Sequence, residues 1–352
     1  MRQPAHGGNL AWAAALAGCP PDAILDFSAS ISPLGPPNSA IAAIKSQIGN
    51  LKHYPDPNYS ELRLALSHFH QVPSEWILPG NGSAELLTLI GRELAQLAAT
   101  ILITPAFGDY YRTLAAYNAN VLECPLSLVT DHWSLFLDKG QRTKDKGLLL
   151  NNPHNPTGKL FTRESILPYL EQFALVVVDE AFMDFVPPNE EQSLIPVVQE
   201  YPNLVVLRSL TKFYSLPGLR LGYAIAHPDC LAKWQLWRDP WPVNTLAAAA
   251  AIAALQDTEF QQQTWAWLPP ARNQLFQGLT EIPGLQPQAS AANFLLVESQ
   301  ESTSQLQQQL LKYHQILIRD CLSFKELGDR FFRVAVREES DNQRLLTALK
   351  ES

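Results

Sequence analysis

The sequence predicts an α/β fold, with a large, doubly wound, mainly parallel sheet domain and a smaller α/β domain. Four short, continuously apolar runs carry the first part of this prediction, and amphipathic segments separate several of them. The runs lie at residues 99–104, 147–150, 175–178 and 204–207. Such runs are typical of strands that are buried on both faces of a parallel sheet. Their alternation with helical segments favours the doubly wound arrangement.

Two segments between these strands have helical character. Ser83 to Leu97 places leucine and isoleucine side chains along one face, which predicts an amphipathic helix. Arg163 to Phe173 predicts another helix. These elements indicate a large domain over residues 40–250.

The second half of the chain changes character after a stretch rich in tryptophan and proline at residues 234–242. An alanine-rich helix is expected from about Asn244. Strands are expected at residues 293–297, 316–319 and 331–336. We therefore expect a small domain over residues 251–352, joined by an N-terminal arm at residues 1–39.

Composition excludes several classes of protein. The 352 residues are 46% hydrophobic and carry a formal net charge of −8, which argues against nucleic acid and anionic membranes as partners. No apolar run reaches the ~18 residues of a membrane span, and residues 10–19 lack the flanks of a secretory signal. The four cysteines lie far apart, which favours reduced thiols in the cytoplasm. His68 and His70 point apart on a helix, so no metal site is expected.

The strongest chemical signal is the segment Arg208-Ser-Leu-Thr-Lys212, with Arg220 eight positions after the lysine. The hydroxyls of Ser209 and Thr211 and the guanidinium of Arg220 can together hold a phosphate. A lysine between them can condense with an aldehyde carried by that phosphate. This combination suits pyridoxal 5′-phosphate (PLP), although the segment alone equally describes an exposed loop lysine.

Further candidates follow the other strands, where ligands of such sheets bind. Gly82, Ser83 and Ala84 open a predicted helix, and its free N–H groups suit a phosphate, although Ser83 can also be an ordinary N-cap. Phe107 can stack on a ring or fill the core. Asn155 lies in a tandem Asn-Pro turn and can donate to a phenolate oxygen. Asp179 directly follows a buried strand, where a carboxylate needs a partner such as a pyridinium nitrogen.

These motifs resemble the aminotransferase class I/II superfamily, which has PLP fold type I. The resemblance rests on Asn155-Pro-Thr-Gly158, Asp179-Glu-Ala-Phe182, Ser209-Leu-Thr-Lys212 and Gly218-Leu-Arg220, and it extends over essentially the whole chain. It implies that Lys212 binds the cofactor covalently and moves protons. Asp179 would pair with the ring nitrogen, Asn155 would bond the phenolate, and Phe107 would stack on the ring. The helix start at residues 82–84, with Ser209, Thr211 and Arg220, would hold the cofactor phosphate.

Segments nearer the termini resemble the threonine-phosphate decarboxylases, a group within this superfamily. They are His6-Gly-Gly-Asn9, Asp26-Phe-Ser-Ala29, Pro33-Leu-Gly35, Tyr54-Pro-Asp56, Trp76-Ile-Leu78 and Phe332-Arg-Val-Ala335. The related histidinol-phosphate aminotransferases usually lack the first motif and carry tyrosine where this chain has Phe182. The alternatives are therefore loss of CO₂ and amine transfer to 2-oxoglutarate. A non-catalytic PLP-binding protein is a more remote alternative.

The resemblance also implies a substrate site for a small phosphorylated amino acid. Arg333 would bind the carboxylate, while His6, Arg319 and Tyr54 would bind the phosphate, with Tyr54 reaching in from the second subunit of a homodimer. The plain alternatives are surface charges for the two arginines and a disordered terminus for His6. Ser30 stands where the decarboxylase pattern often has asparagine, so it offers fewer hydrogen bonds to a substrate phosphate.

Overall fold

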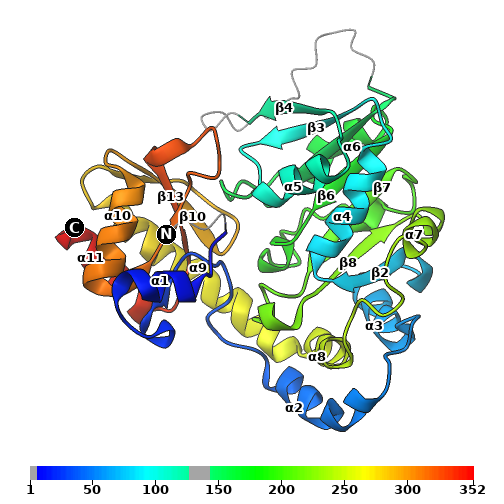
Figure 1. Ribbon diagram of the computed structural model, residues 1–352, viewed down its shortest axis with the longest axis horizontal. Helices are drawn as coiled ribbons and strands as arrows, with labels where there is room; N and C mark the ends of the chain where they lie inside the picture. Colours follow the sequence, from blue (N-terminus) through cyan, green and yellow to red (C-terminus); the bar gives the residue numbers. More distant parts are fainter. Residues whose placement is uncertain (1–5, 127–142) are drawn as a thin grey trace.

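The computed structural model describes residues 6–126 and 143–352. A seven-stranded sheet forms the larger part of the molecule, in the order β2-β8-β7-β6-β5-β3-β4 (Figure 1). Its strands are β2 (Ile77–Asn81), β3 (Ala99–Thr104), β4 (Val121–Pro125), β5 (Lys146–Asn151), β6 (Leu175–Asp179), β7 (Leu204–Ser209) and β8 (Leu221–Ala226). The pairs among β7, β6, β5, β3 and β4 are parallel, and β8 runs antiparallel to both of its neighbours. The predicted mainly parallel α/β sheet is confirmed.

Both faces of this sheet are covered, which explains why its strands are apolar without alternation. Leu148 and Leu150 of β5 pack into one core, whereas Leu149 between them packs into another. The helices of this part are α2 (Asn38–Gln47), α3 (Ser60–His70), α4 (Ser83–Leu94), α5 (Gly108–Ala116), α6 (Arg163–Leu170), α7 (Pro228–Gln235) and α8 (Thr245–Gln256), and α2 packs on α8 rather than on the sheet. The helices α4 and α6 begin where predicted and each ends three residues earlier.

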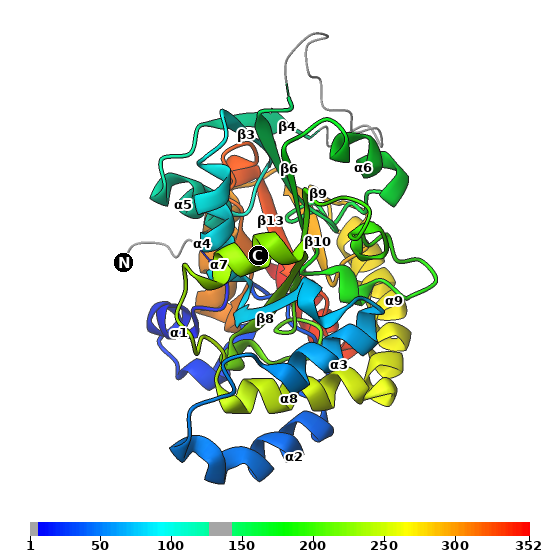
Figure 2. The ribbon, with the colours of Figure 1, turned by 90° about the vertical axis from the view of Figure 1, so that its right-hand side faces the viewer.

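A smaller unit packs beside the large sheet (Figures 1 and 2). Its four strands are antiparallel, in the order β12-β13-β10-β9. They are β9 (Leu285–Pro287), β10 (Phe294–Ser299), β12 (Arg319–Asp320) and β13 (Phe331–Ala335), and the helices of this unit are α9 (Thr258–Thr280), α10 (Thr303–Gln309) and α11 (Glu339–Glu351). The limits of the two domains at residues 39 and 250 stay a prediction.

The N-terminal segment joins this smaller unit. After α1 (Leu10–Ala17), strand β1 (Leu25–Asp26) pairs in parallel with β11 (Ile316–Leu317). The strand predicted at residues 316–319 is therefore divided, because β11 pairs with β1 whereas β12 joins the antiparallel sheet. Arg319 thereby lies in the antiparallel sheet, directly opposite Arg333. No helix within residues 6–126 and 143–352 has the length and apolar character needed to cross a membrane.

Candidate active site

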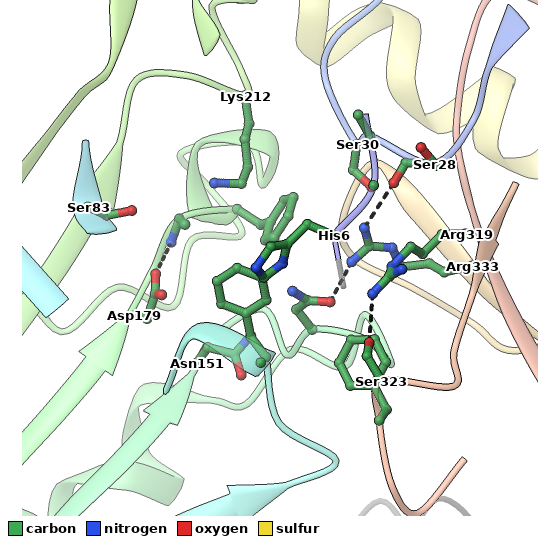
Figure 3. A pocket seen from close by; sticks show the side chains of 18 of the residues that line it. His6, Ser28, Ser30, Ser83, Asn151, Asp179, Lys212, Arg319, Ser323 and Arg333 are labelled. Carbon is green, nitrogen blue, oxygen red and sulfur yellow. Dashed lines mark hydrogen bonds between the residues drawn. The ribbon is translucent and has the colours of Figure 1, made fainter. Parts of the chain in front are cut away.

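A cavity opens between the carboxyl ends of the large sheet's strands and the antiparallel sheet (Figure 3). Residues from three parts of the chain line it, namely the N-terminal segment, the large sheet and the smaller unit. The lining includes His6, Ser28, Ser30, Ser83, Phe107, Tyr110, Asn151, Asn155, Asp179, Phe182, Lys212, Arg319, Ser323, Phe324 and Arg333. Nine of the residues predicted from the sequence are thus brought to one place.

Lys212 follows β7 and extends into this cavity (Figure 3). Its Nζ lies 3.4 Å from Ser209 Oγ and 5.0 Å from the centre of the Phe182 ring. Burial lowers the pKa of Lys212, and the nearby Arg220 and Arg333 lower it further, against the opposing effect of Asp179. A lysine with a lowered pKa is more readily neutral, which is the form that attacks a carbonyl.

Asp179 is the last residue of β6 and lies on the same side of the cavity as Lys212, opposite Arg319 and Arg333 (Figure 3). Its Oδ1 accepts the N–H of Ala181 at 3.0 Å, and its Oδ2 accepts the Tyr110 hydroxyl at 2.8 Å. Burial raises the pKa of Asp179, while Lys212 and these two hydrogen bonds lower it. A buried carboxylate beside a cavity is suited to a cationic ring nitrogen.

The start of α4 forms a cradle for an anion. Gly82 has a φ of +74°, and a Cβ at this position would lie 2.6 Å from Arg220 Nη2. A Cβ on Gly222 would lie 2.5 Å from the backbone nitrogen of Ser83. The two glycines thus let Arg220 and β8 approach the free N–H groups of the helix, which favour a phosphate.

Two hydroxyls complete this cradle. Ser209 Oγ and Thr211 Oγ1 lie 2.7 Å apart, and both residues are buried. Ser209 ends β7, while Thr211 immediately precedes Lys212. The phosphate cradle therefore lies within a few residues of the lysine, as the PLP interpretation requires.

Asn155 lies in the turn that follows β5 and is buried. Its Oδ1 accepts a hydrogen bond from Arg333 Nη1. This bond leaves the amide N–H groups of Asn155 as donors, so the same side chain can orient Arg333 and bond a phenolate oxygen.

Arg333 and Arg319 form the cationic side of the cavity (Figure 3). The two are cross-strand partners, and their exposed fractions are 8% and 6%. Ser323 Oγ accepts from Arg319 Nη2 at 2.6 Å, and Asp320 Oδ1 lies 4.0 Å from Arg319 Nη1. Burial and the neighbouring Arg319 lower the pKa of Arg333 to about 10. Two buried guanidinium groups so close together favour the binding of anionic groups.

The N-terminal segment covers the cavity. His6 lies over Phe107, with 5.5 Å between ring centroids, and Gly8 donates its N–H to Ser28 Oγ at 2.8 Å. A Cβ on Gly7 would lie 2.3 Å from the carbonyl oxygen of Ser28, so glycine permits this close approach. The buried hydroxyl of Ser30 has no hydrogen-bond partner among the described residues and is available to a ligand.

Tyr54 is a predicted site residue that lies in neither the cavity lining nor the phosphate cradle of its own chain. Its exposed fraction is 79%, and its ring stacks on Trp241 with centroids 4.4 Å apart. Tyr54 therefore contributes nothing to the cavity of its own chain, and its predicted role from a second subunit stays a prediction.

Sequence reasoning missed several residues of the cavity. Tyr110 was detectable in principle, because it lies three residues after Phe107 on the same side of a helix. Ser28 lies in the Asp26-Phe-Ser-Ala29 segment but was given no role, and Asn151 and Ser323 carried no comparable signal. The neighbouring Glu180 is fully buried and lies outside the cavity lining, where its Oε1 accepts the N–H of Leu194 at 2.8 Å and its Oε2 lies 3.0 Å from Arg208 Nε.

These residues fit PLP in four independent respects. The cavity presents a lysine beside a hydroxyl pair, a cradle for a phosphate that glycines keep open, a buried carboxylate and an amide donor. The fold and the site therefore define a PLP-dependent enzyme of fold type I.

The family model described as aminotransferase class I and II matches residues 22–349. The chain belongs to this family, and its cofactor is PLP. It is 40% identical to a threonine-phosphate decarboxylase from Salmonella typhimurium, over 98% of this chain and 96% of that protein. It is 33% identical to a histidinol-phosphate aminotransferase from Symbiobacterium thermophilum, over 91% and 88% of the respective chains. The crystal structure of a histidinol-phosphate aminotransferase from Sinorhizobium meliloti with PLP superposes with a TM-score of 0.87, at 23% identity and over 98% and 94% of the two chains.

Proposed function

We propose that this enzyme decarboxylates L-threonine O-3-phosphate to (R)-1-amino-2-propanol O-2-phosphate, a reaction of cobalamin biosynthesis. The observation that carries the proposal is the buried pair Arg319 and Arg333 on the side of the cavity opposite Asp179. A substrate with a carboxylate and a phosphate brings one anionic group for each guanidinium. The 40% identity with the Salmonella decarboxylase supports this choice of substrate.

The cofactor-binding residues have separate tasks. Ser83, Ala84, Ser209, Thr211 and Arg220 hold the phosphate of PLP through N–H groups, hydroxyls and a guanidinium. The Gly82 turn keeps that cradle open. When bound, PLP accepts electrons from the bond that breaks at the substrate's α-carbon.

Other residues set the position and charge of the ring. Asp179 would hold a positive charge on the ring nitrogen, and Asn155 would donate to the phenolate oxygen. Phe107 would pack on the ring face. Lys212 would hold the cofactor covalently and, once the substrate amine has replaced it, its Nζ would carry a proton.

Arg319 and Arg333 would determine which bond at the substrate's α-carbon breaks. The orientation in which these residues hold the substrate would decide whether CO₂ or a proton leaves its α-carbon, because the bound cofactor would accept electrons only from a suitably aligned bond. Arg333 binds the carboxylate, and Arg319 binds the phosphate with His6 and the free hydroxyl of Ser30. Fixing both ends of the substrate would set that orientation. Lys212 Nζ returns a proton to Cα after CO₂ has left.

The amine-transfer alternative uses the same cofactor residues, and a relative at 33% identity bears that name. Phe182 favours the decarboxylase, because it lacks the hydroxyl that usually stands there in the aminotransferases. The His6-Gly-Gly-Asn9 motif favours it too, since His6 lies over Phe107 at the cavity mouth.

We also propose that the enzyme acts as a homodimer in the cytoplasm. Exposed apolar side chains surround Tyr54, because Ile48 and Leu51 precede it closely in the sequence and the exposed Trp241 stacks on its ring. A second copy that covers this surface brings its Tyr54 to the phosphate side of the partner cavity. Burial raises the pKa of the Cys230 and Cys321 thiols to about 12, so both are protonated and unreactive, as suits a reducing compartment.

The test of the function uses pure protein loaded with PLP. Incubation with L-threonine O-3-phosphate should release CO₂ without any 2-oxo acid, and Lys212→Ala should abolish the release. An absolute requirement for 2-oxoglutarate would contradict decarboxylation and favour amine transfer. Retention of the turnover by Lys212→Ala would contradict PLP catalysis altogether.

A further inference from the structure

We propose that Tyr110 is a positioning residue that keeps the Asp179 carboxylate charged and aimed at the cofactor ring. The inference rests on the cofactor assignment but not on the choice between decarboxylation and amine transfer. Nothing in the motifs of the sequence assigned a role to Tyr110.

The geometry starts from helix α5. Tyr110 lies in the first turn of that helix, and only 1% of its surface is exposed. Its hydroxyl donates to Asp179 Oδ2 at 2.8 Å, and the Ala181 N–H donates to Oδ1 at 3.0 Å. Each carboxylate oxygen thus receives one hydrogen bond. These two bonds fix the rotation of the carboxylate, which leaves its remaining lone pairs for the cavity.

The Tyr110 hydroxyl also affects the charge of the Asp179 carboxylate. Burial raises the pKa of Asp179, and the nearby Asp109 raises it as well. The charge of Lys212 and the hydrogen bonds from the Tyr110 hydroxyl and the Ala181 N–H lower the pKa of Asp179. A hydrogen bond donated to the carboxylate stabilises the charged form. Burial and the neighbouring Asp179 hold the pKa of Tyr110 well above its usual value, so the phenol stays a donor.

A purely structural role is the competing explanation. The Tyr110 ring packs edge-on against Phe107, with centroids 5.7 Å apart, and belongs to the core on that face of the sheet. Tyr110→Phe separates the two explanations, because it keeps the ring and removes only the hydroxyl. Tyr111→Phe is a matched control, since it makes the same change on the next residue, whose ring contacts Lys325 instead.

The first measurement is the affinity of the apoprotein for PLP, which is monitored by absorbance. It is repeated at decreasing pH, over the range in which the wild type loses the cofactor. PLP should bind at a pH above the pKa of the Asp179 carboxylate, and its affinity should be lost as the pH falls through that pKa. Tyr110→Phe should move that acid limb up by about one pH unit, which is about a tenfold loss of affinity on the limb. Tyr111→Phe should follow the wild type. An unshifted limb in Tyr110→Phe, or a loss that is equal at every pH, would overturn the proposal.

A double-mutant cycle gives a second test. In an Asp179→Asn background the charge is gone, so adding Tyr110→Phe should change PLP affinity by less than roughly threefold. A full tenfold effect in that background would show that Tyr110 acts through packing. Because both readouts are cofactor binding, they stand even if threonine phosphate proves not to be the substrate. Failure of the wild-type protein to bind PLP would instead contradict the cofactor assignment.

Discussion

Arg319 on β12 and Arg333 on β13 are direct cross-strand partners in an antiparallel pair, and both side chains are buried in the wall of one cavity. Like charges directly opposite each other destabilise a sheet, and buried charges need partners. Ser323 and Asn155 accept hydrogen bonds from the two guanidiniums, and Asp320 Oδ1 lies 4.0 Å from Arg319 Nη1. Two cationic groups side by side in a cavity wall are suited to the binding of anionic groups.

The protein should gain stability from small anions through this pair. Inorganic phosphate should raise the melting temperature of the wild type, because it binds the folded state and relieves the repulsion. Arg319→Gln should abolish most of this increase. Differential scanning calorimetry against phosphate concentration measures it, with the more exposed Arg344→Gln as control. An equal increase in the melting temperatures of the wild type, Arg319→Gln and Arg344→Gln would show that phosphate binds at another site.

Arg319 should also determine the preference for a phosphorylated substrate. Loss of a buried charge partner should cost about 2–5 kcal/mol of binding free energy for threonine phosphate. Unphosphorylated threonine should be affected far less, since it has no group for Arg319. Steady-state kinetics of Arg319→Gln give kcat/KM for both compounds, and the ratio of the two values measures the preference for the phosphorylated substrate. If both substrates lose kcat/KM equally, Arg319 does not contact the phosphate.

Substrate affinity should fall at high pH because of Arg333. Its pKa is lowered to about 10, so the guanidinium is charged below that pH and neutral above it. Binding of the substrate carboxylate should therefore weaken as the pH rises through about 10. Titration of threonine phosphate binding between about pH 8 and 10.5 measures this limb. Arg333→Gln should bind weakly throughout and lack the limb, and persistence of the limb in this variant would assign it to another group.

Tyr54 should act on the cavity of the partner subunit. Tyr54→Phe and Lys212→Ala should each be impaired as homodimers, but mixing the unfolded chains and refolding them together should restore activity. A mixed dimer then has one cavity with both native residues, which gives about a quarter of the wild-type activity per chain at equal mixing. Absence of recovery, in dimers verified by mass, would mean that Tyr54 acts within its own chain or not at all.

The features predicted correctly from the sequence share one physical origin. The apolar runs at β3, β5, β6 and β7 are unmistakable because both faces of the sheet are buried. The carboxyl ends of parallel strands meet at one edge, so residues that follow separate strands, such as Asn155, Asp179 and Lys212, could be placed together from the sequence. Lys212 and its neighbours were recognisable for the same reason.

The rest depended on contacts that sequence periodicity does not record. The division of residues 316–319 between two sheets follows from the pairing of β1 with β11, which are almost 300 positions apart in the chain. The opposition of Arg319 to Arg333 follows from that division. Ser323 supports Arg319 from a loop, and the Tyr110 hydroxyl reaches Asp179 across 69 positions. Neither contact has a fixed spacing that a pattern could reveal.

The most direct test of the central claim is a single incubation of the PLP-loaded protein with L-threonine O-3-phosphate and 2-oxoglutarate together. The two products to be counted are CO₂ and glutamate. Decarboxylation predicts one CO₂ and one 1-amino-2-propanol O-2-phosphate for each substrate consumed, with no more than trace glutamate and no change when 2-oxoglutarate is left out. Glutamate formed in step with substrate loss, without CO₂, would contradict the account.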